Sequence, residues 1–506
     1  MHELDGKSLT LEILERLTAG GAEVRLAPAA LDRMAAARTV VEQVLQNGQV
    51  IYGVNTGFGK LSDVRIPHED LKTLQRNLIL SHACGMGAPL SRPEVRAVLA
   101  LKTNALLNGY SGCRPIVAQY LHRMLQADIL PLIPEKGSVG ASGDLAPLAH
   151  LSLILIGMGE AWVKDRKLNG KEALRHIDLP PLELQAKEGL ALLNGTQFMT
   201  GVGALACAQM LNLVRVADIC GAMSAEALLC TPVAFDPRIQ VARGYAGQQQ
   251  VAANLRRLMA HSPIRNSHLE CNRVQDAYSV RCMPQVHGAI RDFLTPVRDI
   301  FGIELNAATD NPLVFAEDQE ILSGGNFHGH PISTACDLIS ILATQLANIS
   351  ERRIAFAIDP KMSDLPAFLV KRSGLNSGFM IAQVAAAALV SENKTLSHPA
   401  SVDSIPTSAN KEDYVSMGAA AAVKARNAVK NTASVLAIEL LCACQALDLR
   451  APLEPGPATK AVRKLVREHV AFLTDDRMLA QDFDAVTNLI ISGEVVRVAQ
   501  AVVGEL

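Results

Sequence analysis

Residues 198–230 constrain the fold more than any other part of the chain, because nearly every side chain in this segment is apolar. The rare charged exceptions are Arg215, Asp218 and Glu226. A helix that is apolar on all sides must be buried on most of them. A second segment carries apolar residues at steps of three and four, the pattern of a long amphipathic helix. Its stripe consists of Ala335, Leu338, Leu342, Leu346 and Ile349.

Residues 415–447 predict a third long helix, because they are rich in alanine, the best helix former. Alternating segments of β-branched residues are scarce. We therefore expect a mainly α fold, with a loop-rich N-terminal domain (residues 1–195) and a bundle of long, largely buried helices (residues 196–506). Glycine and proline gather in four segments that are typical of loops. These are residues 52–59, 84–89, 131–143 and 323–331.

Charged residues make up 19% of the 506 residues, which is below the roughly 25% of an ordinary soluble domain. This low fraction favours extra buried surface, most simply a subunit interface. The formal net charge of −2 offers no overall positive charge for binding nucleic acid. Residues 1–20 contain no apolar signal-peptide core, and uninterrupted apolar stretches fall far short of about 18 residues. We therefore expect a cytoplasmic protein that does not span a membrane.

The most informative segment for chemistry is residues 137–149, in which glycines and serines flank Ala141-Ser142-Gly143. Asp144 suits the cap of a following helix, and Pro147 suits its first turn. The loop would then lie at the positive end of a helix. By composition alone this is a glycine-rich turn. The nucleophile elbow GxSxG and the dinucleotide fingerprint are both absent from it.

The run Ala-Ser-Gly followed by Asp-Leu-Ala-Pro-Leu resembles the cofactor-forming motif of the aromatic amino acid ammonia-lyases. In that family the glycine nitrogen attacks the alanine carbonyl, and loss of two waters gives a methylidene-imidazolone. The resemblance implies that Ala141, Ser142 and Gly143 form this electrophile autocatalytically. Ser142 would supply the hydroxyl whose loss creates the exocyclic methylene, and Gly143 would permit the tight backbone approach.

Residues 52–59 resemble the tyrosine loop of the same family, although alone they read as a mobile glycine loop. The resemblance implies that Tyr52 removes the β-proton of the substrate. Tyrosine has an unperturbed pKa near 10. It therefore needs positive surroundings to act as a base near neutral pH.

Residues 77–85 contain Ser81 and His82, which resemble the substrate-selecting pair of the family's histidine-specific branch. A lone histidine beside an apolar helix is otherwise usually structural. An imidazole in the substrate can exchange a hydrogen bond with His82, whereas a phenyl ring cannot. In residues 193–197, the resemblance implies that Asn194 binds the prosthetic ring and the substrate region.

In residues 275–285, a helix would place Gln275, Tyr278 and Arg281 on one face, because they are three residues apart. An exposed polar face is the plainer interpretation. The resemblance implies that Arg281 binds the substrate carboxylate, which a guanidinium can hold with two hydrogen bonds. It also places Gln275 and Tyr278 in the same pocket, with Tyr278 among the catalytic residues.

Residues 323–329 match another loop of the family, in which Phe327 would pack against the prosthetic ring. His328 and His330 form an HxH pair, but no carboxylate or third histidine completes a recognisable set of ligands. We therefore expect no metal site.

In residues 407–418, the resemblance implies that Glu412 faces the substrate. The histidine branch has glutamine before this glutamate and histidine two residues after it. Here these positions hold Lys411 and Tyr414, which affects the expected substrate preference and not the reaction type.

Taken together, the resemblance implies a carbon–nitrogen lyase that deaminates L-histidine to trans-urocanate, the first step of histidine degradation. It also implies a homotetramer whose active sites are shared between subunits. A lyase or aminomutase that acts on phenylalanine, tyrosine or another aromatic amino acid is the alternative. An inactive helical scaffold is the alternative from another class, and it predicts no prosthetic group.

Overall fold

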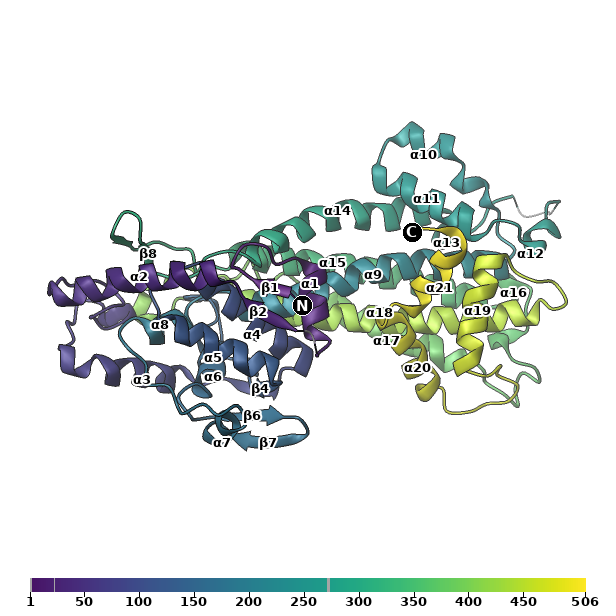
Figure 1. The fold of residues 1–506 in the computed structure, drawn as a ribbon. Coiled ribbons are helices and arrows are strands. Elements are labelled where there is room, and N and C mark those ends of the chain that lie inside the picture. The colour runs from purple at the N-terminus through teal and green to yellow at the C-terminus, as the bar shows by residue number, and fades with distance from the viewer. Residues whose placement is uncertain (1, 22, 271–273) are drawn as a thin grey trace. The chain divides into compact units, whose positions relative to one another are not determined.

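The computed structural model describes residues 2–21, 23–270 and 274–506, and most of these residues lie in helices (Figure 1). The predicted mainly α fold is confirmed. Contacts group the chain into two compact units. Unit 1 comprises Met1–Ala208, Arg298–Asp337 and Pro399–Arg426, and unit 2 comprises Gln209–Val297, Leu338–His398 and Asn427–Leu506. The division at residue 195 that the sequence suggests stays a prediction.

The three long helices predicted from the sequence are present. They are α9 (Gln197–Ala227), α15 (His330–Ile358) and α18 (Gly418–Leu449). Each begins in unit 1 and ends in unit 2, whereas α14 (Met283–Glu304) begins in unit 2 and ends in unit 1.

By length and hydropathy, α9, α15 and α18 could each cross a membrane, and so could the bent pair α20–α21 if it counts as one span. Uninterrupted apolar runs do not predict this, because polar residues interrupt the apolar sequence of each helix. In the apolar windows of the three long helices, 72%, 72% and 83% of the residues are buried within the protein. Their apolar side chains therefore pack against other parts of the chain.

Unit 1 is built around α4, whose side chains are buried along most of its length. Helices α1, α2 and α5 pack against it. The helices contained in unit 1 are α1 (Leu11–Thr18), α2 (Pro28–Gln46), α3 (Leu71–His82), α4 (Arg92–Leu107), α5 (Pro115–Gln126), α6 (Leu145–Leu153), α7 (Gly170–Arg175) and α8 (Glu188–Leu193).

The strands of unit 1 are short and form small separate sheets. They are β1 (His2–Leu4), β2 (Val24–Leu26), β3 (Met86–Pro89), β4 (Ile129–Pro131), β5 (Pro134–Lys136), β6 (Glu160–Val163), β7 (Arg166–Asn169), β8 (Leu313–Phe315) and β9 (Glu320–Leu322). The pair β1–β2 is parallel, whereas β3–β5, β4–β6–β7 and β8–β9 are antiparallel. Because β3 and β5 lie in segments predicted as loops, that prediction was wrong for them. Strands of three or four residues, interrupted by glycine or proline, are too short to show an alternating pattern.

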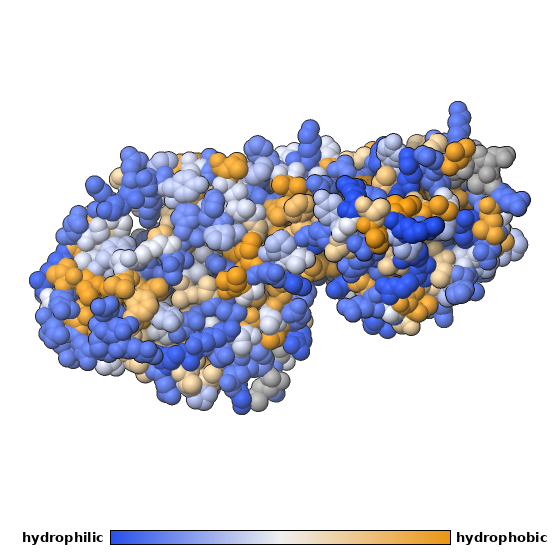
Figure 2. All heavy atoms as spheres, turned by 90° about the horizontal axis from the view of Figure 1, so that it is seen from above, coloured by the Kyte–Doolittle hydropathy of each residue, from blue (hydrophilic) through white to orange (hydrophobic). Residues whose placement is uncertain are grey.

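The described residues of unit 2 form helices and loops without a named strand, and α19 packs against α20 and α21. The helices contained in unit 2 are α10 (Pro237–Arg243), α11 (Ala246–Leu258), α12 (Pro263–Asn266), α13 (Tyr278–Arg281), α16 (Pro360–Ser363), α17 (Met380–Leu396), α19 (Pro457–His469), α20 (Ala480–Ile491) and α21 (Glu494–Val503). On the face drawn in Figure 2, hydrophilic residues predominate and apolar side chains form scattered groups.

Candidate active site

The Ala141-Ser142-Gly143 loop folds back on itself immediately before α6. Short main-chain bridges pair Gly143 with Gly140, with Ala141 and with Gly195. Gly143 has φ +75°, and a Cβ atom there would lie 2.1 Å from the carbonyl oxygen of Gly195. Only glycine fits this approach. The fold thus brings the main chains of Ala141 and Gly143 together.

Asp144 ties this loop to the start of α9. It occupies the N-cap position of α6, as predicted, but its side chain does not cap that helix. One carboxylate oxygen instead accepts a hydrogen bond from the main-chain nitrogen of Met199, at 2.9 Å. Burial raises the pKa of Asp144 to about 7, against the opposing effect of the N–H groups of Met199 and Phe198.

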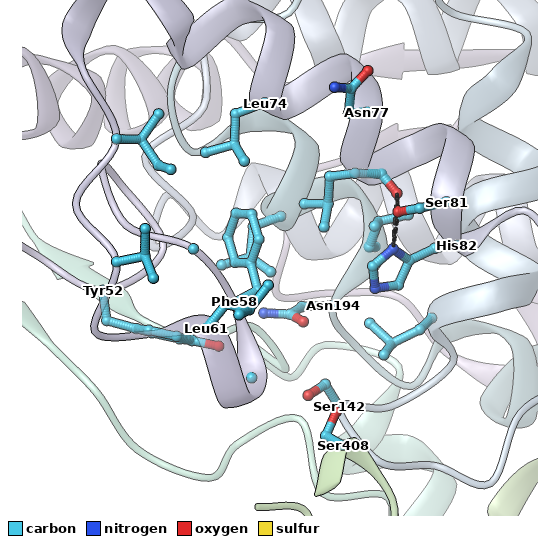
Figure 3. A pocket seen from close by; sticks show the side chains of 18 of the residues that line it. Tyr52, Phe58, Leu61, Leu74, Asn77, Ser81, His82, Ser142, Asn194 and Ser408 are labelled. Carbon is cyan, nitrogen blue, oxygen red and sulfur yellow. Dashed lines mark hydrogen bonds between the residues drawn. The ribbon is translucent and has the colours of Figure 1, made fainter.

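A cavity of about 490 Å³ lies within unit 1 (Figure 3). Its lining includes five of the predicted site residues, which are Tyr52, His82, Ser142, Asn194 and Glu412. A second cavity of about 600 Å³ includes Ala141 and Phe327 in its lining, together with Lys411 and Tyr414. The two cavities have Tyr52, Gly59, Ser142, Asn194 and Glu412 in common. The structure therefore brings together predicted residues that are far apart in the sequence.

Tyr52 is half-buried at the junction of the two cavities. Burial raises the pKa of its phenol, and the negative charges of Glu412 and Asp310 raise it further. A hydrogen bond with the main chain of Gly59 acts in the opposite direction. The positive surroundings that a basic tyrosine needs are therefore not supplied by these neighbours.

His82 ends α3, and its Nδ1 atom lies 2.8 Å from the carbonyl oxygen of Leu78 and 3.1 Å from Ser81 Oγ. Burial lowers the pKa of this imidazole, whereas the Leu78 hydrogen bond and the charge of Glu412 raise it. Because a carbonyl oxygen only accepts hydrogen bonds, the Nδ1 atom carries the proton. In the neutral ring the Nε2 atom is then an acceptor.

Asn194 is held from several sides at the C-terminal end of α8. Its Nδ2 atom donates to Asp310 Oδ1 at 3.0 Å and to the carbonyl oxygen of Asn311 at 2.8 Å. The buried ammonium of Lys187 binds the other oxygen of Asp310 at 2.7 Å. The main-chain oxygen of Asn194 accepts from Lys102 Nζ at 2.6 Å.

Lys102, Lys187 and Asp310 were not predicted from the sequence as site residues. A signal for Lys102 was present, because it is a single lysine in an otherwise largely apolar helical segment. For Lys187 and Asp310, nothing in their spacing indicated a pairing over more than 100 residues.

Glu412 accepts a hydrogen bond from Thr407 Oγ1 at 2.9 Å, and the main chains of these two residues are also bonded. Among the ion pairs of the described residues, none joins Lys411 to Glu412. The ring of Tyr414 stacks on that of His328, with centroids 5.9 Å apart and planes inclined by 8°. Lys411 and Tyr414, the two residues that differ from the histidine-branch pattern, thus line the second cavity without binding Glu412.

Gln275, Tyr278 and Arg281 belong to unit 2, and none of them lines either cavity. Because α13 begins at Tyr278, the prediction that Gln275 shares its helical face was wrong. The Arg281 guanidinium lies 4.5 Å from the centroid of the Tyr278 ring, which is a cation–π contact. The backbone of α13 is held by Arg353, which donates to the carbonyl oxygen of Ser279 at 3.2 Å.

The described residues contain no group of three or more His, Cys, Asp and Glu side chains placed to bind a metal ion. The rings of His328 and His330 lie 6.0 Å apart.

Comparison with known proteins gives a consistent result. The sequence profile described as Aromatic amino acid lyase matches residues 9–468. A protein named histidine ammonia-lyase from Anaeromyxobacter sp. (strain K) is 53% identical over 97% of this chain and 98% of its own.

Two solved structures extend the comparison to the fold. The crystal structure of histidine ammonia-lyase from Trypanosoma cruzi has a TM-score of 0.93 and 44% identity, covering 100% of this chain and 96% of that one. Tyrosine aminomutase from Streptomyces globisporus has a TM-score of 0.93 and 38% identity, covering 100% and 99%.

Proposed function

The chain belongs to the family of aromatic amino acid lyases, and from this we propose that it eliminates ammonia from L-histidine to give trans-urocanate. The observation that carries the choice of histidine is the fixed orientation of His82. Its Nε2 atom is left as an acceptor beside a cavity that Glu412 also lines. An imidazole substrate has an N–H group to donate there, whereas a phenyl ring has none.

The residues of the loop fit a methylidene-imidazolone formed from Ala141, Ser142 and Gly143. The close approach of the main chains at Ala141 and Gly143, and the absence of space for a side chain at Gly143, favour ring closure. The nitrogen of Gly143 would bond to the carbonyl carbon of Ala141, and two waters would leave. When present, this group supplies an electrophile that assists departure of the amine.

Different side chains of the site remove the proton and bind the substrate. Tyr52 takes the β-proton, while His82 and Glu412 bind the imidazole ring. Arg281 binds the carboxylate with two hydrogen bonds, and holding the substrate in this way lowers the barrier by several kcal/mol. Asn194, Gln275, Tyr278 and Phe327 complete the pocket.

We propose that the active form is a cytoplasmic homotetramer in which each site takes residues from more than one subunit. No arginine lines either cavity, so neither lining supplies the guanidinium that the role assigned to Arg281 requires. Tyr278, beside Arg281, is 71% exposed in the single chain, and Val274 is 94% exposed. These side chains are available to a neighbouring subunit. A positive group from that subunit would also supply what Tyr52 needs in order to act as a base.

Parallel ultraviolet progress curves with L-histidine, L-tyrosine and L-phenylalanine test the proposal, with the product identified by mass spectrometry. Elimination creates a conjugated acrylate that absorbs where its substrate does not. Urocanate from histidine alone is the expected result. A β-amino acid from tyrosine would point to an aminomutase, like the similar structure from Streptomyces globisporus, and would assign the substrate preference to Lys411 and Tyr414. An absence of product from all three amino acids would contradict the proposal.

A further inference from the structure

Lys102 is a buried cation with neutral partners. It lies in α4 with 2% of its surface exposed. Its Nζ atom lies 2.6 Å from the main-chain oxygen of Asn194 and 3.4 Å from Gln197 Oε1. The nearby carboxylate of Asp310 is already bound by Lys187 and by the side chain of Asn194.

Holding an ammonium group in this place is costly, because burial removes the water that stabilises its charge. Burial lowers the pKa of Lys102 to about 8, which leaves the side chain charged at neutral pH. A methionine would fill similar space without this cost. A charge kept under such conditions points to a use for it.

The use follows from the peptide unit that Lys102 binds. The carbonyl oxygen of Asn194 and the N–H of Gly195 belong to the same peptide group. That N–H donates to the main-chain oxygen of Ser142, over a long hydrogen bond of 3.4 Å. The carbonyl oxygen of Gly195 in turn accepts from the N–H of Asp144 at 2.8 Å. One peptide thus connects the ammonium of Lys102 to the carbonyl of Ser142.

A cation on the oxygen of a peptide draws electron density from its nitrogen and makes the N–H a stronger donor. The carbonyl oxygen of Ser142 collects negative charge when the Cα proton of that residue is removed. The Cβ hydroxyl then leaves, a Cα=Cβ double bond forms, and the proton and hydroxyl depart together as one water. A preorganised donor at this oxygen lowers the barrier to the elimination.

We propose that Lys102, acting through the Asn194–Gly195 peptide, stabilises charge on the Ser142 carbonyl and accelerates the dehydration of Ser142. Lys102 is a positioning residue in this role, since it acts through another group. The inference rests on the proposed function, but only on the part that concerns ring formation. Its test therefore does not depend on which amino acid is the substrate.

The experiment measures the intact mass of the full-length chain at intervals after synthesis in a cell-free system. The proteins compared are wild type, Lys102→Met, Lys102→Gln and Lys430→Met, whose exposed lysine serves as the control. Ser142→Ala marks the mass of a chain that cannot complete the dehydration. Thermal melting is recorded for each variant.

We expect wild type and Lys430→Met to lose two waters at the same rate. Lys102→Met should lose them about tenfold more slowly, a smaller effect than removal of a direct donor. Lys102→Gln should lose the waters at a rate between those of wild type and Lys102→Met, because its amide donates a hydrogen bond without a charge. A purely structural role instead predicts that slow dehydration accompanies a lower melting temperature in both Lys102 variants.

Dehydration of folded Lys102→Met at the wild-type rate would overturn the proposal. If Lys102→Met does not fold, dehydration of folded Lys102→Gln at the wild-type rate would overturn the proposal instead. Wild-type chains that lose no water would overturn both this inference and the proposed prosthetic group. By contrast, normal dehydration without turnover of histidine would affect only the choice of substrate.

Discussion

The Nδ1 atom of His82 lies 2.8 Å from the carbonyl oxygen of Leu78, one helical turn earlier in α3. This contact fixes the tautomer of the imidazole, because the Leu78 oxygen has no proton to give. The opposite nitrogen therefore presents a lone pair. Under the proposed function, this lone pair selects a substrate side chain that donates an N–H, and the following tests examine that role.

Replacement of His82 by leucine should lower kcat/KM for histidine by about ten- to a hundredfold, because a buried hydrogen bond of roughly 1–3 kcal/mol is lost. Kinetics with histidine and phenylalanine, measured side by side, check the change in selectivity. His469→Leu is the control, since His469 is exposed and lies in α19. Unchanged selectivity in His82→Leu would place ring recognition elsewhere.

The acid limb of the kcat/KM profile should contain a contribution from His82 below pH 6.5, because burial lowers its pKa from that value. Protonation of Nε2 removes the acceptor, so activity is present above the lowered pKa and lost as the pH falls through it. The measurement compares wild type with His82→Gln, whose amide oxygen accepts without titrating in this range. Ionisation of the substrate is common to both proteins. An identical limb in both would exclude His82 as its source.

The Ser142→Ala chain should fold but should not lose two waters, and its activity should fall by orders of magnitude. The missing hydroxyl prevents formation of the exocyclic methylene. Intact mass and turnover of histidine provide the two readouts. The matched control is Ser391→Ala, which removes an exposed hydroxyl in α17 and leaves Ser142 in place. Full activity of Ser142→Ala would refute the role of the loop.

Arg281→Lys should raise KM and lower kcat although the charge is kept. A lysine cannot form the two parallel hydrogen bonds of a guanidinium, and it loses the planar group that lies over Tyr278. Steady-state kinetics with histidine measure the effect, with Arg497→Lys on the exposed surface of α21 as the control. Kinetics close to wild type would contradict the anchoring role.

Glu439→Gln should destabilise the protein by about 3–5 kcal/mol, because it leaves Arg353 buried without its counter-charge. The two side chains are 1% and 0% exposed and are joined by bonds of 2.5 and 2.9 Å. Ser224 and Ser350 also donate to this carboxylate. Glu494→Gln removes an exposed ion pair with Arg497, which solvent screens, and should therefore change stability far less. Denaturant midpoints that shift equally would show that burial of the pair is unimportant.

Helices whose residues follow a short repeat could be predicted from the sequence. The apolar steps around Leu342 and the alanine-rich run after Gly418 each correspond to a helix within a few residues. The five cavity residues found together were predicted through motifs, since periodicity carries no information on how Tyr52 approaches Glu412.

Contacts that depend on tertiary structure could not be predicted in this way. Asp144 suits a helix cap by type, but its carboxylate binds the start of α9, more than 50 residues away. Gln275 has helical spacing to Tyr278, yet the helix begins only at Tyr278. In each case a local preference was outweighed by packing between segments that are distant in the sequence.

His82 and the Ala141-Ser142-Gly143 loop come from different elements, the end of α3 and the loop before α6. If the proposed roles hold, selectivity and reactivity are encoded in separate stretches of the gene. A library that randomises positions 81 and 82 while preserving residues 137–144 would explore new amino acids without disturbing the electrophile.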